Sequence, residues 1–157
     1  MAEVRAVVLE LLAQLGSSRE ARQYLKEFSS VDEARFAVVK VGGGVLEQQL
    51  DELASALAFL HRLGLRPVVL HGAGPQVDRA LAEAGIDSRR HEGLRVTDAA
   101  VMEVARPVIY GANLRLVEAL EARGIRARGI QHGVFRCDYL DQEKLGLVGR
   151  ITRVDLC

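Results

Sequence analysis

Two apolar runs that each end in a glycine-rich turn decide the fold of this chain. They are RFAVVKVGGG at residues 35–44 and RPVVLHGAGP at residues 66–75. A continuous apolar run bounded by chain-breaking residues is typical of a strand covered on both faces. Between the runs, leucines recur at helical spacing, at Leu46, Leu50, Leu53, Leu57 and Leu60. The pattern predicts two parallel strands joined by a crossover helix, with both glycine turns at one edge of the sheet.

Composition limits the classes of function. The chain has 157 residues, 49% of them apolar, which is enough for one sizeable core. Lys plus Arg and Asp plus Glu number 21 each, and only 4% of residues are aromatic, so we expect no nucleic-acid partner and no anionic membrane surface. Cys137 and Cys157 form no metal-spaced pair. We therefore expect a cytoplasmic protein without a membrane span and without a metal bound by its own residues.

A helical arm is predicted at residues 1–30. Apolar residues recur at helical spacing through residues 2–15, and Ser17 with Glu20 forms a capping box for a second helix that ends near Phe28. The arm serves oligomerisation or regulation, or else it is a helix packed on the core. The remainder, residues 31–157, is expected to be one lobe of an α/β domain with an open, mostly parallel sheet between helix layers.

Further elements are predicted downstream. Pro75 is expected in the first turn of a helix that ends at Gly85, followed by a short hairpin over residues 86–96. Thr97 is expected to cap a helix that leads to Tyr110 and Gly111. A further helix is then predicted at residues 114–122, and strands at 125–130, 134–139 and 147–154. Because no breaker follows the last strand, we expect it to be cut off from a longer chain.

Lys40 is the first candidate functional residue. It is one of three lysines against 18 arginines, and it lies inside an apolar strand just before Gly42, Gly43 and Gly44. Burying an ammonium without an anion is costly, whereas a compact positive charge suits bridging phosphates. The alternative is a strand-end lysine that extends to solvent.

The glycine turns predict an anion site. Glycine allows close approach of the backbone, and the start of a helix adds partial positive charge. The turn at Gly72 to Gly74 is not a dinucleotide fingerprint, because Val77 occupies the place of its third glycine, and neither turn has the Walker sequence. Phosphate or carboxylate is the expected ligand.

Arg95 and His71 are the other candidates near these turns. Apolar neighbours flank Arg95, so its guanidinium is expected to be fixed where it can grip a carboxylate; the alternative is an internal salt bridge. His71 follows the second strand, and we interpret it as a hydrogen-bonded structural histidine. His91 and His132 show no spacing that would make a metal site or a catalytic triad.

These motifs together resemble the amino acid kinase family, specifically N-acetylglutamate kinase. The similar segments are Lys-x-Gly-Gly from Lys40, His-Gly-x-Gly-Pro-Gln from His71, and Gly-Leu-Arg-Val-Thr from Gly93, within residues 35–155. YLKEF at residues 24–28 and GVF at 133–135 are similar more narrowly to the kinase half of bifunctional N-acetylglutamate synthase/kinase proteins.

The resemblance implies roles for the candidate residues. Lys40 would neutralise the phosphates, and Gly42, Gly43 and Gly74 would donate backbone N–H groups to the transferred phosphoryl. N-acetyl-L-glutamate would be bound by Gly72, Ala73, Gly74 and Arg95. Ala73 replaces a glycine common in the family, and its backbone donor is retained if the local φ is negative. ATP with Mg would bind over a second lobe of an eight-stranded sheet.

The chemistry fits the residues, and it leaves alternatives. A carboxylate nucleophile is ionised at neutral pH, so its phosphorylation needs positioning and charge neutralisation but no general base. The family's Asn-Val-Asn-Ala-Asp motif, second lysine and nucleotide lobe do not occur here, so we expect this chain alone to be inactive. We separately expect a homo-oligomer, because the last strand has an unpaired apolar edge. The alternatives are a kinase-like regulatory domain of an N-acetylglutamate synthase, binding arginine or acetylglutamate without turnover, and a purely structural interaction module.

Overall fold

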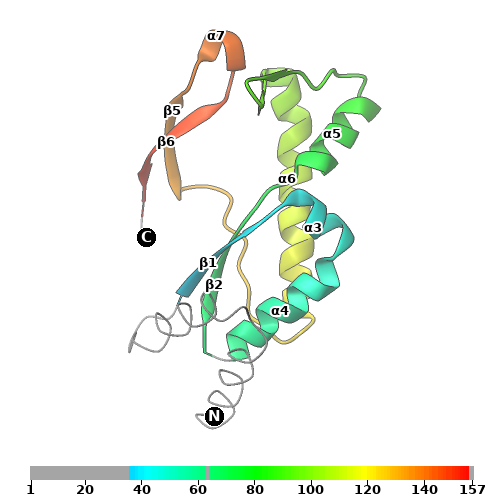
Figure 1. Ribbon diagram of the computed structural model, residues 1–157, viewed down its shortest axis with the longest axis vertical. Coiled ribbons are helices and arrows are strands. Elements are labelled where there is room, and N and C mark those ends of the chain that lie inside the picture. Colours follow the sequence, from blue (N-terminus) through cyan, green and yellow to red (C-terminus); the bar gives the residue numbers. More distant parts are fainter. Residues whose placement is uncertain (1–35, 63, 156–157) are drawn as a thin grey trace, which may run out of the picture.

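The computed structural model describes residues 36–62 and 64–155, so the predicted arm at residues 1–30 lies outside the described part of the chain. Figure 1 shows the elements in chain order. They are β1 (Phe36–Val41), α3 (Gly43–Gln48), α4 (Leu50–Arg62), β2 (Arg66–His71), α5 (Gly74–Glu83), β3 (Arg90–His91), β4 (Leu94–Arg95), α6 (Ala99–Glu121), β5 (Phe135–Tyr139), α7 (Gln142–Leu145) and β6 (Gly149–Val154).

β1 and β2 form the predicted parallel pair. The register runs from Phe36 opposite Arg66 to Val41 opposite His71. α3 and α4 make the crossover between the two strands. Because the strands are parallel and in register, their carboxyl ends meet, and the two glycine turns lie together as expected. The α/β class is confirmed.

Helices cover one face of this strand pair. Val41 of β1 is buried in a core with Leu46, Leu57, Leu81 and Leu116, which come from α3, α4, α5 and α6. On the other face, Val38, Val68 and Leu70 are 59%, 51% and 44% exposed. Within the described residues, therefore, the expected second helix layer over β1 and β2 is not seen.

α6 is one helix of 23 residues, where two were predicted. Pro107 and Gly111 suggest a break, but Val101, Ala105, Ala112, Leu116 and Leu120 are all buried against the core. This continuous buried stripe outweighs the local cost of proline and glycine. The cap is also one residue later than predicted, because the Asp98 side chain accepts a hydrogen bond from the Val101 backbone N–H at 2.9 Å.

Two other expectations are corrected. The crossover contains two helices instead of one, since Gln49 leaves the helical backbone region with φ −137° and ψ 36°. Residues 125–130 do not form a strand. Ile125 and Ala127 are half-buried against the core, and Gly129 lies against the Asn113 side chain, so this segment packs on α6 and its neighbours without pairing with a strand.

The predicted strands near the end of the chain form an antiparallel hairpin. β5 pairs with β6, and α7 connects them. The Thr97 backbone anchors this connection near the start of α6: its N–H donates to Leu145 O at 2.9 Å, and its carbonyl accepts from Leu147 N. The only parallel strands in the described residues are β1 and β2. Among those residues, no helix is long and apolar enough to cross a bilayer.

Candidate anion and carboxylate site

The two glycine turns are in direct contact. The Gly72 N–H donates to Val41 O at 3.0 Å, which closes the ends of β1 and β2. A Cβ built on Gly43 would lie 2.9 Å from Gly74 N and 3.0 Å from Ala73 Cα. Only glycine fits at residue 43, and this fit brings the starts of α3 and α5 together.

The Gln76 side chain links the two glycine turns. Its Nε2 donates to Gly43 O at 2.7 Å, and the residue is only 8% exposed. A buried amide bound to the opposite turn resists separation of the turns. Gln76 belongs to the predicted His-Gly-x-Gly-Pro-Gln motif, but no role was predicted for it. The only signal for that role was the position directly after Pro75, in the first turn of α5.

Backbone donors at this edge are suited to an anion. The first N–H groups of a helix have no intrahelical partner and carry partial positive charge. Ala73 precedes α5 with φ −140° and ψ 33°, so the condition on its backbone donor is met. Gly42 precedes α3 in an extended conformation with φ −71°. Neither cap position has a side chain bound to the helix start.

Lys40 lies on the exposed face of β1, beside Val38. Strand alternation directs Lys40 away from Val41, which is buried under the helices. Among the described residues it forms no ion pair. The lysine therefore has solvent around it, two residues before the first glycine turn.

Arg95 contacts the second glycine turn and also makes an internal salt bridge. Its Nη2 donates to Asp78 Oδ1 at 2.7 Å and to Gly74 O at 3.3 Å, and its side chain is only 15% exposed. The guanidinium is held by Asp78 of α5, so the internal salt bridge named as the alternative is present. The role of Arg95 in binding a carboxylate stays a prediction. A hydrogen bond from Ser88 and the nearby charges of Arg95 and Arg90 lower the pKa of the Asp78 carboxyl, against the effect of desolvation.

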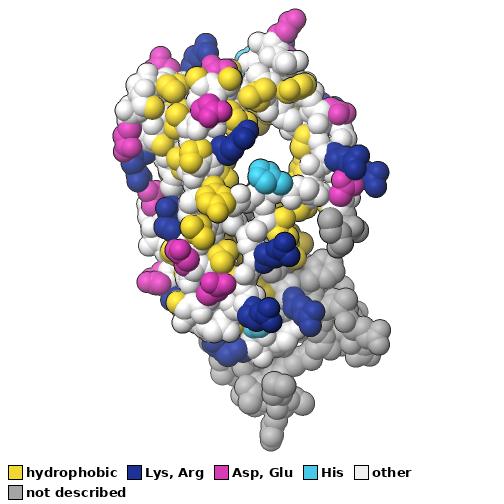
Figure 2. All heavy atoms as spheres, turned by 180° about the vertical axis from the view of Figure 1, so that it is seen from behind, with side chains coloured by type: hydrophobic (Ala, Val, Ile, Leu, Met, Phe, Trp, Pro, Cys, Tyr) yellow, Lys and Arg dark blue, Asp and Glu magenta, His cyan; other side chains and the backbone are white. Residues whose placement is uncertain are grey.

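His71 has the structural role that was expected. Asn113 Nδ2 donates to His71 Nε2 at 3.0 Å, and His71 Nδ1 faces Gly72 O at 3.4 Å. Both ring nitrogens therefore lie within hydrogen-bonding distance of a polar partner. His71 and Asn113 lie in the wall of a cavity of about 860 Å³ between β2, α6 and residues 130–135. Figure 2 shows hydrophobic side chains gathered around an opening in the face seen from behind.

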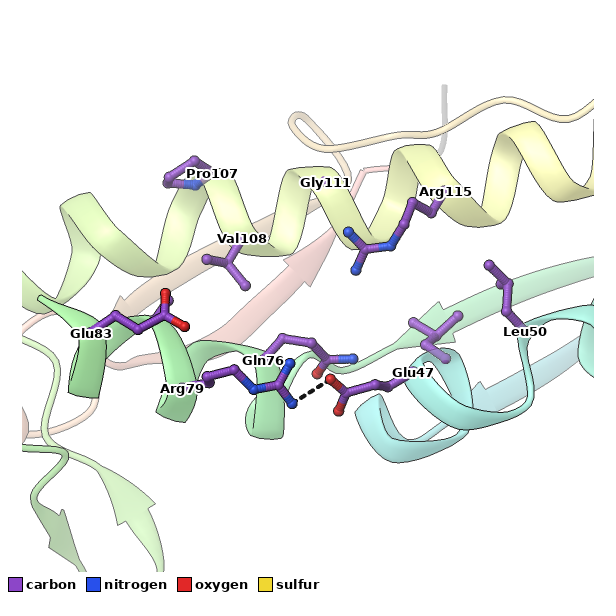
Figure 3. A pocket seen from close by; sticks show the side chains of 11 residues that line it. Glu47, Leu50, Gln76, Arg79, Glu83, Pro107, Val108, Gly111 and Arg115 are labelled. Atoms are coloured by element: carbon purple, nitrogen blue, oxygen red, sulfur yellow. Dashed lines mark hydrogen bonds and ion pairs between the residues drawn. The ribbon is translucent and has the colours of Figure 1, made fainter.

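A second hollow, of about 550 Å³, lies between α3, α5 and α6. In Figure 3, Arg79 of α5 and Glu47 of α3 form an ion pair at its edge, while Arg115 extends from α6 and Gln76 lies near its floor. Two cations and two carboxylates, Glu47 and Glu83, line it, so the net charge of the lining is balanced. No group of three metal-ligating side chains occurs among residues 36–62 and 64–155.

Comparison with known proteins gives three informative similarities. Acetylglutamate kinase of Xylella fastidiosa (strain 9a5c) is 52% identical over 142 residues, which are 90% of this chain and 34% of the relative. The mitochondrial protein arg-6 of Neurospora crassa is 50% identical over 151 residues, 96% of this chain and 17% of the relative. The structure of N-acetylglutamate synthase from Neisseria gonorrhoeae, complexed with coenzyme A and N-acetyl-glutamate, has 26% identity and a TM-score of 0.67, covering 87% of this chain and 32% of that one.

The chain thus spans between about a sixth and a third of the length of these curated relatives. The profile of the amino acid kinase family matches residues 35–156. This match contains both glycine turns, the β3–β4 hairpin with Arg95, and all of α6. The chain belongs to the amino acid kinase family.

Proposed function

We propose that this chain is the substrate-binding lobe of an N-acetylglutamate kinase, which transfers the γ-phosphoryl group of ATP to the side-chain carboxylate of N-acetyl-L-glutamate. The observation that carries the proposal is the contact between the Gly43 and Gly74 turns, with Arg95 bound to the carbonyl of Gly74. Backbone N–H groups that can bind an anion and a fixed guanidinium then lie at one edge of the sheet. The identity of about 50% to an acetylglutamate kinase supports the choice of substrate.

In this proposal the site residues bind the phosphoryl group or the substrate, and Gly74 takes part in both tasks. The N–H groups of Gly42, Gly43 and Gly74 bind the phosphoryl oxygens, where charge develops during transfer. Lys40 adds a mobile positive charge beside them.

The carboxylate of the substrate is bound by Arg95 and by the turn at Gly72, Ala73 and Gly74. Its nucleophilic oxygen is already ionised, so this edge acts by positioning and by charge neutralisation. ATP brings Mg as a phosphate counterion when bound; we assign no protein ligand to it.

Binding and turnover test the proposal separately. N-acetyl-L-glutamate should bind to the 157-residue chain in a calorimetric titration, and N-acetyl-L-glutamine, which lacks the side-chain carboxylate charge, should bind at least tenfold more weakly. The longest natural form of the protein should then form ADP from ATP only when acetylglutamate is present. Equal affinity for the two compounds would contradict the proposed substrate class.

A second candidate is a kinase-like regulatory domain of an N-acetylglutamate synthase. The similarity to the Neisseria gonorrhoeae synthase favours it, although at 26% identity against about 50% for the kinase. Such a domain would bind acetylglutamate or arginine without forming ADP. The turnover assay therefore separates the two candidates, and an arginine titration of the same protein shows whether arginine is a regulator.

The oligomeric state and the cellular location also remain proposals. We propose a cytoplasmic homo-oligomer. The exposed apolar side chains of Val38, Val68 and Leu70 on the open face of β1 and β2 support association. Sedimentation velocity of the purified chain measures its state of association, and a monomer at all concentrations would contradict the oligomer.

A further inference from the structure

We infer that Asp78 is a positioning residue that fixes Arg95 at the carboxylate site. The inference rests on the proposed function of Arg95. Asp78 lies on α5, four residues after Gly74, so its carboxylate stands one helical turn below the second glycine turn. Among the described residues its carboxylate accepts hydrogen bonds from Ser88, Arg90 and Arg95 and from no N–H of the glycine turns, so it would act on a ligand only through Arg95.

The contacts of Arg95 show how this works. Asp78 Oδ1 and Gly74 O both accept from Nη2 of Arg95. No described residue accepts from Nη1 or Nε, so these N–H groups remain available to a ligand oxygen. The side chain is 15% exposed, which limits its rotamers. The salt bridge therefore orients the guanidinium and leaves part of it free, which lowers the entropic cost of binding a carboxylate.

The same carboxylate attaches the hairpin that carries Arg95. Ser88 Oγ donates to Asp78 Oδ1 at 2.6 Å, and Arg90 Nη2 lies 3.3 Å from Oδ2. β3 and β4 pair through only two residues on each side. Asp78 thus receives hydrogen bonds from three residues of a short hairpin segment, and its charge offsets the repulsion between the Arg90 and Arg95 guanidiniums. Asparagine has nearly the same shape but cannot supply that charge.

A double-mutant cycle tests the inference. The four proteins are the 157-residue chain, Asp78→Asn, Arg95→Ala and the double variant, and calorimetry measures their affinity for N-acetyl-L-glutamate. We expect Asp78→Asn to weaken binding about tenfold in the original chain and less than twofold when Arg95 is already alanine. Asp87→Asn is the control, because Asp87 is exposed and forms no ion pair among the described residues; it should leave affinity unchanged. Additive losses in the cycle would overturn the inference.

A readout that needs no ligand keeps this inference separate from the proposed function. In NMR spectra, the Arg95 Nε–H and guanidinium signals should show slow rotation and slow exchange in the original chain, and should become averaged in Asp78→Asn. Ser88→Ala removes a different partner of Asp78 and should leave those signals slow. If the original chain does not bind acetylglutamate, the proposed function fails, and the NMR result alone decides the positioning role. Unchanged Arg95 signals in Asp78→Asn would overturn that role.

Discussion

Gly43 is the residue where the site depends most on the absence of a side chain. A Cβ there would meet Gly74 N at 2.9 Å and Ala73 Cα at 3.0 Å, and both are backbone atoms that cannot turn aside. We expect Gly43→Ala to force the turns apart, to lower the free energy of unfolding by about 1 to 3 kcal/mol and to abolish acetylglutamate binding. Chemical denaturation and calorimetry measure the two effects.

Gly44 is the matched control for Gly43. It lies in the same helix, and a Cβ there would meet nothing within 4 Å. Gly44→Ala should therefore leave binding intact and raise the free energy of unfolding by about 0.5 to 1 kcal/mol, because alanine loses less conformational entropy in a helix. Equal damage from both substitutions would mean that the contact between the turns is not the cause.

The proposed role of Lys40 can be tested only by measuring turnover. Its ammonium has solvent on the open face of β1 and acts, in our proposal, on charge that develops at the phosphoryl group. In the longest natural form of the protein, Lys40→Ala should lower kcat on the order of a hundredfold while the affinity for acetylglutamate changes less than twofold. A parallel loss of affinity would place Lys40 in substrate binding instead.

Only the backbone part of the site, the two glycine turns, could be predicted from the sequence. Glycines after two apolar runs predict adjacent turns, because parallel strands end at one edge. The partners of those turns were not predictable, since Gln76 and Asp78 are ordinary polar residues on a helix until the fold places them opposite Gly43 and Arg95. Contacts across 17 or 33 positions have no local signal.

At the scale of the elements, the side-chain cap at the start of α6 can be tested. Asp98 accepts a hydrogen bond from the Val101 N–H, while the Thr97 hydroxyl donates to Arg95 O. Asp98→Ala should therefore lower the free energy of unfolding by about 1 kcal/mol, and Asp98→Asn, which keeps a capping oxygen, should restore most of it. Thermal and chemical unfolding of the two variants check this. No difference between alanine and asparagine would show that the side-chain cap contributes nothing.

Element prediction failed where burial and backbone rules disagree. Pro107 and Gly111 locally favour a break, yet the buried face of α6 runs through both and keeps one helix. Apolar and polar residues alternate over 125–130 as they do in a strand. Such alternation indicates that one side of the segment packs on the core, but it does not indicate that a neighbouring strand pairs with it. Strands β1, β2 and β6 were predicted well because they contain β-branched residues and have glycine or proline at or near an end. β5 contains no β-branched residue, and it was predicted from its position shortly after Gly133.

For the whole molecule, the shifted carboxyls predict a loss of stability in acid. Hydrogen bonding and cationic neighbours lower the pKa of Asp78, and the Lys144 backbone N–H lowers the pKa of Asp141, the N-cap residue of α7. A group whose pKa is lower when folded stabilises the fold above its unfolded value, near 3.8, and loses that effect as pH falls through the folded value. Urea unfolding at pH 7 and pH 3 should show this fall, and Asp78→Asn should reduce it. An unchanged difference in Asp78→Asn would remove Asp78 from the acid response.

The central claim is that the edge formed by the two glycine turns and Arg95 binds the carboxylate substrate of a phosphoryl transfer. The most direct measurement is a calorimetric titration of N-acetyl-L-glutamate into the original chain and into Arg95→Lys. We predict saturable binding that lysine weakens by about 1 to 3 kcal/mol, because lysine cannot reproduce the planar set of donors of a guanidinium. Absence of binding to the original chain, or equal affinity for the two proteins, would contradict the claim.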